Sequence, residues 1–145
     1  MKVDTKTRGI IDVDERQKIT IPQGLFGFEG YVNFVLIDAE QEPFYWLQST
    51  DDKNIAFVII NPFVFRPDYE INIAGGELAD LGIQKPEQAV IFSIVTIPHE
   101  GTITANLQGP LVINRDTKIA KQAILNDSRW QTRHDIMAEL EGSRT

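Results

Sequence analysis

Residues 89–97 read Ala-Val-Ile-Phe-Ser-Ile-Val-Thr-Ile, and their only polar side chains are Ser93 and Thr96. A run of this length that is apolar on both sides of the pleat is typical of a central strand covered on both faces. Its β-branched and aromatic residues favour a strand over a helix. The run is far too short to cross a bilayer as a helix. The sequence therefore predicts a sheet organised around this central strand.

Shorter strand candidates flank the run on both sides and are separated by turn residues, mainly glycine, proline and asparagine. They cover residues 19–21, 32–37, 44–48, 55–60, 69–73, 102–104 and 111–113. Residues 120–125 fit either a strand or the start of a helix. Eight to ten short strands with little helix predict a mainly β fold, which we expect to be a small antiparallel β-barrel-like single domain covering residues 1–145.

One or two short helices are expected beside this sheet. The first covers residues 77–81 and ends at Gly82. The second covers residues 129–140, follows a cap at Asp127 or Ser128, and places Trp130 in a partial apolar stripe. Residues 141–145 have the composition of a frayed tail.

The composition is that of one ordinary globular domain. The chain has 145 residues, of which 42% are hydrophobic and 24% charged, so it can bury a sizeable core. It has no cysteine, which excludes disulfides, thiolate metal sites and a cysteine nucleophile. The first residues lack the apolar stretch of a signal peptide, so we expect a cytoplasmic protein without a membrane anchor.

The acidic charge is concentrated in one part of the chain. The formal net charge is −7, and residues 29–80 carry ten acidic side chains against only Lys53 and Arg66. A negative field of this kind repels phosphate backbones and attracts basic partners. The charge distribution therefore disfavours direct binding of nucleic acid.

The sequence contains no recognisable catalytic set. His99 and His134 are the only histidines, and we expect the first in a turn and the second solvated on the last helix. Asp51 and Asp52 lack the spacing of a calcium loop and are typical of a hairpin tip. We therefore expect no enzyme, no cofactor and no metal site. Two alternatives stay open: a metal-dependent hydrolase that uses Asp51 or Asp52, and a small nucleic-acid-binding β-barrel that exposes aromatic rings.

Aromatic residues gather in the acidic segment, with eleven of the thirteen between Phe26 and Tyr69. Phe63, Phe65 and Tyr69 lie on a connection between strands that Pro62 and Pro67 stiffen. Rigid aromatic side chains next to acidic ones are typical of a protein-binding anchor. The alternative is that these rings fold back and cover one end of the barrel.

Several blocks of the chain form a recognisable series. An opening loop reads Ile-Pro-Gln-Gly-Leu-Phe-Gly-Phe, and a strand reads Pro-Phe-Tyr-Trp-Leu-Gln-Ser. The blocks are residues 21–28, 43–49, 57–62, 67–69, 94–96, 104–110 and 113–114. In this order they resemble the FliW family of flagellar assembly factors. The segment after Leu125, with Trp130, matches no family pattern. Each block alone is weakly specific, whereas their succession over most of the chain is specific.

The resemblance implies a β-barrel-like protein without enzymatic activity that has two alternative partners. One is flagellin, held in the cytoplasm before export, and the other is CsrA, a dimeric RNA-binding repressor of flagellin translation. The protein would sequester CsrA when flagellin leaves and would act as a chaperone-like escort for flagellin. The resemblance also implies that CsrA is inhibited without its RNA-binding surface being covered. No nucleic acid or membrane would be bound directly, and we expect the free protein to be a monomer.

Site residues are assigned by combining this resemblance with the residue chemistry. For CsrA we expect contacts from the aromatic and acidic residues Phe65, Asp68, Tyr69 and Glu70, with Asp51 and Asp52 as charges at the rim. For flagellin, whose ends are amphipathic, we expect contacts from Leu25, Phe26, Asn106, Leu107 and Pro110. Asn106 equally fits a turn-forming amide that bonds its own backbone.

Overall fold

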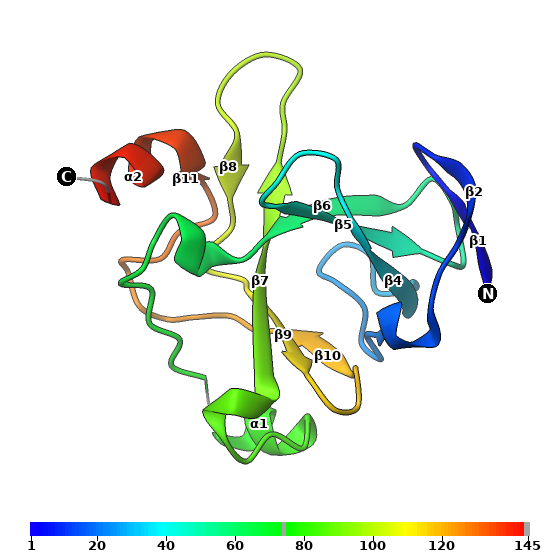
Figure 1. Ribbon diagram of the computed structural model, residues 1–145. Helices are drawn as coiled ribbons and strands as arrows, with labels where there is room; N and C mark the ends of the chain where they lie inside the picture. The colour runs from blue at the N-terminus through cyan, green and yellow to red at the C-terminus, as the bar shows by residue number, and fades with distance from the viewer. Residues whose placement is uncertain (74, 144–145) are drawn as a thin grey trace.

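The computed structural model describes residues 1–73 and 75–143, and it is built on one strongly curled antiparallel sheet (Figure 1). The strands along this sheet follow the order β10-β9-β7-β6-β5-β4-β3. Their bounds are β3 (Lys18–Thr20), β4 (Asn33–Asp38), β5 (Phe44–Ser49), β6 (Ala56–Ile60), β7 (Ala89–Thr96), β9 (Leu111–Asn114) and β10 (Ala120–Gln122). A parallel bridge from Thr20 to Ile119 connects the two edges. The predicted mainly β, barrel-like fold is confirmed, although this single bridge is less than a closing ladder.

The predicted central strand is β7. One half of it pairs with β9 from Ala89 to Phe92, and the other half pairs with β6 from Ser93 to Val95. Its last residues also pair with the short strand β8 (Thr104–Ala105), which in turn pairs with β11 (His134–Asp135). Strand β7 has neighbouring strands on both sides and protein on both faces, so few of its side chains meet water. This explains why its sequence is almost entirely apolar.

The concave, inner face of the sheet encloses the largest apolar cluster. Alternate residues of each strand point to this face, as the two-residue period of a strand requires. Its members that are no more than 1% exposed are Ile21, Leu25, Phe34, Leu47, Ile59, Leu111 and Ala120.

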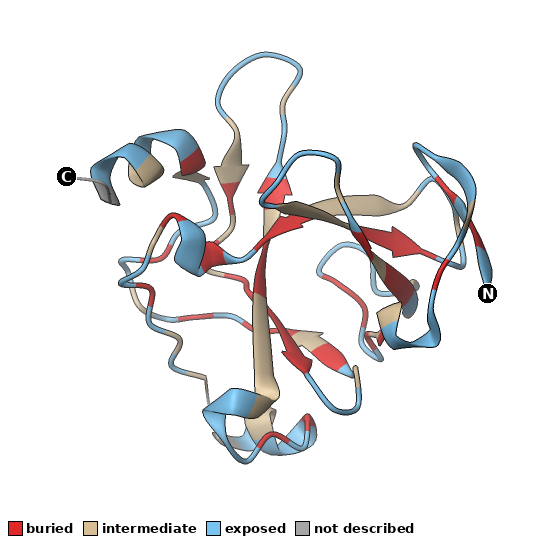
Figure 2. Ribbon diagram, in the orientation of Figure 1, coloured by how far each residue is buried: buried red, intermediate tan, exposed pale blue. Residues whose placement is uncertain are grey.

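Two flaps cover parts of the outer face, where buried residues of the strands lie beneath them (Figure 2). The hairpin of β1 (Lys2–Thr5) and β2 (Gly9–Asp12) packs Val3 over Val35 and Ile37 of β4. At the other side, the chain after Asn61 and the chain after Leu125 pack together over Ile60 and Val95. The outer face is therefore apolar as well, although only part of it lies under the flaps.

Short helices lie outside the sheet and at chain turns. They are η1 (Glu15–Gln17), η2 (Pro62–Val64), α1 (Gly75–Asp80), η3 (Pro86–Gln88) and α2 (Ile136–Ser143). Helix α1 confirms the short helix that the sequence predicts, and Gly82 follows it at a φ of +71°. A side chain rarely adopts that backbone conformation, which explains the glycine.

The expected helix over residues 129–140 is wrong in its first half. Asp127 closes a turn in which its carbonyl accepts the Trp130 N–H at 3.0 Å, and the chain then extends to form β11. The helix begins only at Ile136. Pairing with β8 and burial of Trp130, which is 1% exposed, thus override a local pattern that favours a helix.

Two smaller expectations also differ, and one open alternative is decided. Residues 69–73 lie extended against the sheet without joining a ladder, because Ile71 and Ile73 pack on the outer-face clusters instead of pairing. Residues 120–122 form the strand β10, which resolves the two readings left open for this segment. Helix α2 continues through Ser143, inside the predicted frayed tail, and residues 144–145 lie outside the described residues.

Candidate partner-binding surfaces

Phe65 and Tyr69 belong to the core and do not form an exposed anchor. Phe65 is 0% exposed and Tyr69 is 4% exposed. The Tyr69 ring meets the Trp130 ring edge to face at 4.8 Å, and its hydroxyl donates to the Leu107 carbonyl at 2.5 Å. Burial raises the pKa of Tyr69 well above its usual value. The predicted direct contacts by these two rings are therefore wrong. The rings fold back onto the protein, as the alternative expects, but they cover the outer face of the sheet and not one end of the barrel.

The acidic residues beside Tyr69 are paired with arginines. Arg66 holds Asp68 through two bonds of 2.9 Å and also pairs with Glu139. The guanidinium of Arg66 lowers the pKa of Asp68 to about 2. Arg129 similarly bonds Glu70 at 3.1 Å, so both predicted contact carboxylates have their charge offset within the molecule.

A stack of side chains fixes these arginines in place. The guanidinium carbons of Arg66 and Arg129 each lie 4.9 Å from the centroid of the Trp130 ring. Such cation–π contacts hold the charged groups against the ring and favour the ion pairs. Trp130 thus joins the chain after Asn61 to the chain after Leu125, a role that no local sequence signal indicates.

Asp51 and Asp52 lie at the tip between β5 and β6, as expected for a hairpin. Each accepts a nearby backbone N–H: Asp51 accepts that of Asn33 at 3.3 Å, and Asp52 that of Asn54 at 2.9 Å. They lie at the opposite end of β6 from Asp68, a strand of roughly 15 Å. Asp51 and Asp52 therefore lie apart from Asp68 and Glu70, and their role as rim charges stays a prediction.

The structure brings two of the predicted flagellin contacts to one hollow, which we call the mouth groove. Phe26 and Asn106 meet there, beside inner-face residues of β6 and β7, around a volume of about 420 Å³. Phe26 is 53% exposed and Phe28 36% exposed, so aromatic surface is open to solvent. The lining residues are Leu25, Phe26, Phe28, Phe57, Ile94, Thr96, Asn106, Gln122, Thr132 and Arg133.

A buried amide holds the two sides of the mouth groove together. The Gln122 side chain accepts the Phe26 N–H at 2.9 Å and donates to the Gly109 carbonyl at 3.0 Å. Asn106 accepts the Gly109 N–H at 2.8 Å, which confirms its reading as a turn-forming amide.

The other three expected flagellin contacts lie inside the protein. Leu25 is 1% exposed, Leu107 is 0% exposed, and Pro110 is also buried. Leu25 only contributes to the floor of the mouth groove. Direct contacts by Leu107 and Pro110 are therefore wrong, whereas Phe26 and Asn106 remain candidates.

A second hollow, which we call the outer groove, was not indicated by the sequence analysis. It lies on the outer face of β5 and β6, between the hairpin tip of β1 and β2 and the chain that joins β7 to β8, and its volume is about 310 Å³. Figure 1 shows the chains that follow β4 and β7 close together at this side. The lining residues are Thr7, Arg8, Ala39, Glu40, Gln41, Phe44, Trp46, Val58, Ile97 and Ile103.

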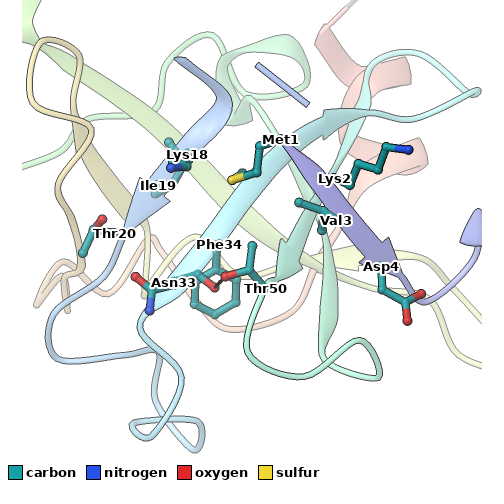
Figure 3. Close-up of a pocket in the computed structure, with 10 residues that line it drawn as sticks. All are labelled: Met1, Lys2, Val3, Asp4, Lys18, Ile19, Thr20, Asn33, Phe34 and Thr50. Atoms are coloured by element: carbon teal, nitrogen blue, oxygen red, sulfur yellow. Dashed lines mark hydrogen bonds between the residues drawn. The ribbon is translucent and has the colours of Figure 1, made fainter. Parts of the chain in front are cut away.

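A third hollow lies where β1 crosses the edge of the sheet (Figure 3). Its floor includes Phe34, and Lys2 points away from it. Lys18 lines it but is paired with Glu15 at 3.2 Å. This hollow of about 280 Å³ has no converging set of charged groups among its described lining residues, so it is a weaker candidate.

Neither histidine belongs to a group of metal-ligating side chains among residues 1–73 and 75–143. His99 is in the turn after β7, as expected. His134 is not solvated: its Nε2 accepts the Gln131 N–H at 2.8 Å and its Nδ1 lies 3.0 Å from Glu139. Across residues 1–73 and 75–143, no three histidine or acidic side chains gather as metal ligands. In the same part of the chain no helix is long and apolar enough to cross a membrane.

The curled sheet and the mouth and outer grooves on its two faces define a small, mainly β binding protein. A family model described as FliW protein matches residues 2–136. The chain is 46% identical to the flagellar assembly factor FliW of Treponema denticola over 144 residues, which is 99% of this chain and 98% of that one. It is 41% identical to the factor of the same name from Leptospira biflexa, over 96% and 93% of the two chains. The chain belongs to the FliW family, as the resemblance predicts.

The structural comparison agrees with the sequence comparison. A crystal structure of the flagellar assembly factor FliW superposes with a TM-score of 0.85 and is 35% identical in sequence. The match covers 94% of this chain and 96% of the other. The fold described above is therefore the fold of that family.

Proposed function

We propose that this protein is a regulator of flagellar assembly that binds two protein partners in turn, CsrA and flagellin. The observation that carries the proposal is the family match, which extends over residues 2–136. The aromatic side chains that line the two open grooves support it, because solvent-exposed aromatic surface is a feature of protein-binding sites. In this proposal the protein acts in the cytoplasm and transforms no substrate.

The mechanism is a pair of linked binding equilibria. Cytoplasmic flagellin occupies the protein until flagellin is exported, and the freed protein then captures CsrA and ends repression. If CsrA is inhibited without its RNA site being covered, the protein must bind RNA-free CsrA more tightly than RNA-bound CsrA. A tenfold effect on RNA affinity needs about 1.4 kcal/mol of such difference.

Of the mouth groove and the outer groove, the mouth groove is the better candidate for the flagellin site. An amphipathic segment would place apolar side chains against Phe26 and Phe28, which are already exposed to solvent. Arg133 lines the same groove and forms no ion pair with any described residue, so it is available to a carboxylate of the partner.

The test is a mixing experiment with purified CsrA, purified flagellin and a labelled flagellin leader RNA. Adding this protein to the CsrA–RNA complex should release RNA, and adding flagellin should restore the complex. The protein with RNA alone should give no shift, since the acidic segment disfavours nucleic acid. If RNA stays bound to CsrA at saturating protein, or flagellin never reverses the release, the proposal is wrong.

A further inference from the structure

The outer groove is floored by the outward-facing residues of β5 and β6. The register pairs Trp46 directly with Val58, and Phe44 lies one outward position further along β5. All three are only partly buried, although the outer-face positions beside them are core. Ile97 stands at the edge of the groove and is 57% exposed.

The groove is exposed because the two flaps on the outer face do not meet. The β1–β2 hairpin covers the outer face as far as Trp46. The chains that pack around Trp130 cover it from Phe44 and Val58 onward. The uncovered strip between the two flaps is lined by aromatic and aliphatic side chains. Partly desolvated apolar pockets with an aromatic floor are where anchoring residues of a partner bind.

Unpaired negative charge lies beside this groove. The chain joining β4 to β5 carries Glu40, which lines the groove, and Glu42, and the turn after β7 carries Glu100. All three are exposed, and none forms an ion pair with a described residue. Among the described residues, Arg8 is the one basic side chain that lines the groove.

This arrangement contrasts with the surface that the sequence favoured. At Asp68 and Glu70 the carboxylates are already bound by Arg66 and Arg129, so a basic partner would have to displace those bonds. At the outer groove the carboxylates are free to pair with incoming lysines or arginines. Complementary charge at a rim raises the rate of encounter and selects the partner, while the apolar centre supplies affinity.

We infer that the outer groove is the docking site for a basic protein surface, one that inserts an apolar side chain over Trp46 and Val58 and sets lysine or arginine against Glu40 and Glu42. Resting on the proposed function, that partner is CsrA, which would dock through basic side chains outside its RNA site, because the mouth groove on the opposite face is the one that fits an amphipathic flagellin segment. The groove serves as the anchoring centre of a larger contact, since stable interfaces bury roughly 800 Å² on each partner.

The location has a consequence for the two partners. The mouth groove uses Phe57 and Ile94, whereas the outer groove uses Val58 and the end of β7 at Ile97. Adjacent residues of a strand point to opposite faces, so the two grooves lie on opposite faces of β6 and β7. A substitution in one groove should therefore leave the other groove intact. Flagellin and CsrA would then exclude each other through the overlap of partners that are much larger than the grooves.

The test measures CsrA binding by titration calorimetry for the wild type and for matched variants. Ile97→Ser removes exposed apolar surface at the groove, and Ile124→Ser is its control, because Ile124 is 56% exposed and lines none of the hollows described above. Ile97→Ser should weaken CsrA binding at least tenfold, and the control less than twofold.

The charge arm uses Glu40→Lys with Glu42→Lys and, as control, Asp51→Lys with Asp52→Lys. The first pair should weaken binding at least tenfold and flatten its dependence on salt, and the control should do neither. Glu40→Gln with Glu42→Gln repeats the test without added charge. Both groove variants should bind flagellin as the wild type does, which also shows that they are folded.

The outcomes test the docking site and the proposed function separately. If the wild type binds CsrA and the groove variants bind it equally well, the outer groove is not the site and only this inference is wrong. The same holds if the Asp51 and Asp52 reversal is the one that weakens binding. If the wild type itself binds no CsrA, the proposed function fails, and the inference fails with it.

Discussion

Removing the Tyr69 hydroxyl separates a structural role for this residue from a role in binding. In Tyr69→Phe the ring still packs edge to face on Trp130, but the buried Leu107 carbonyl loses its hydrogen bond. A buried carbonyl left without a partner costs about 1–2 kcal/mol. For a chain of this length that loss lowers the midpoint of thermal unfolding by roughly 3–8 °C.

The assay pairs thermal unfolding with CsrA titration. Tyr69→Phe should lower the unfolding midpoint while CsrA binding stays within twofold of the wild type. Tyr31→Phe is the control, because the half-buried Tyr31 hydroxyl makes no hydrogen bond to the described residues, and its cost should stay below about 0.5 kcal/mol. Unchanged stability with lost CsrA binding would refute the placement of Tyr69 in the core.

Three further predictions concern stability and the mouth groove. Because Arg66 lowers the pKa of Asp68 to about 2, their ion pair stabilises the fold above pH 4, and this stabilisation is lost between pH 4 and pH 2. In acid unfolding, the free energy of unfolding of Asp68→Asn should therefore depend less on pH in that window than that of the wild type. Gln122→Leu leaves the Phe26 N–H and the Gly109 carbonyl unpaired and should lower the free energy of unfolding by about 2–3 kcal/mol, measured in urea. Phe26→Ser should weaken flagellin binding at least fivefold in a pull-down titration without lowering the unfolding midpoint, because the ring is 53% exposed.

The strands that form the sheet can be predicted from the sequence because their signals are local. Residues 89–97 are apolar on both faces, and β7 is indeed covered on both. The β1–β2 hairpin was missed, because its four-residue strands bury few side chains and its turn is closed by a hydrogen bond from Thr5 to the Gly9 carbonyl. Trp130 was placed on a helix because pairing with β8 is a long-range contact that no window of sequence contains.

The surfaces are harder to predict because charge and burial depend on distant pairs. The sequence shows that residues 29–80 are acidic, but it does not show that Arg129 neutralises Glu70 from 59 positions away. Phe44, Trp46 and Val58 look like core residues, and only the extent of the two flaps decides that they are partly exposed. The loop positions of Phe26 and Asn106 could be predicted, since glycines and a turn amide mark loops, whereas their contacts with a partner stay a prediction.

Hydrogen–deuterium exchange of the protein alone, with CsrA and with flagellin tests the central claim most directly. The account predicts that CsrA slows exchange in residues 38–46 and 97–103, and that flagellin slows it in residues 25–28 and at Asn106. Slowed exchange at residues 65–70 and 127–130, with no change at either groove, would contradict it.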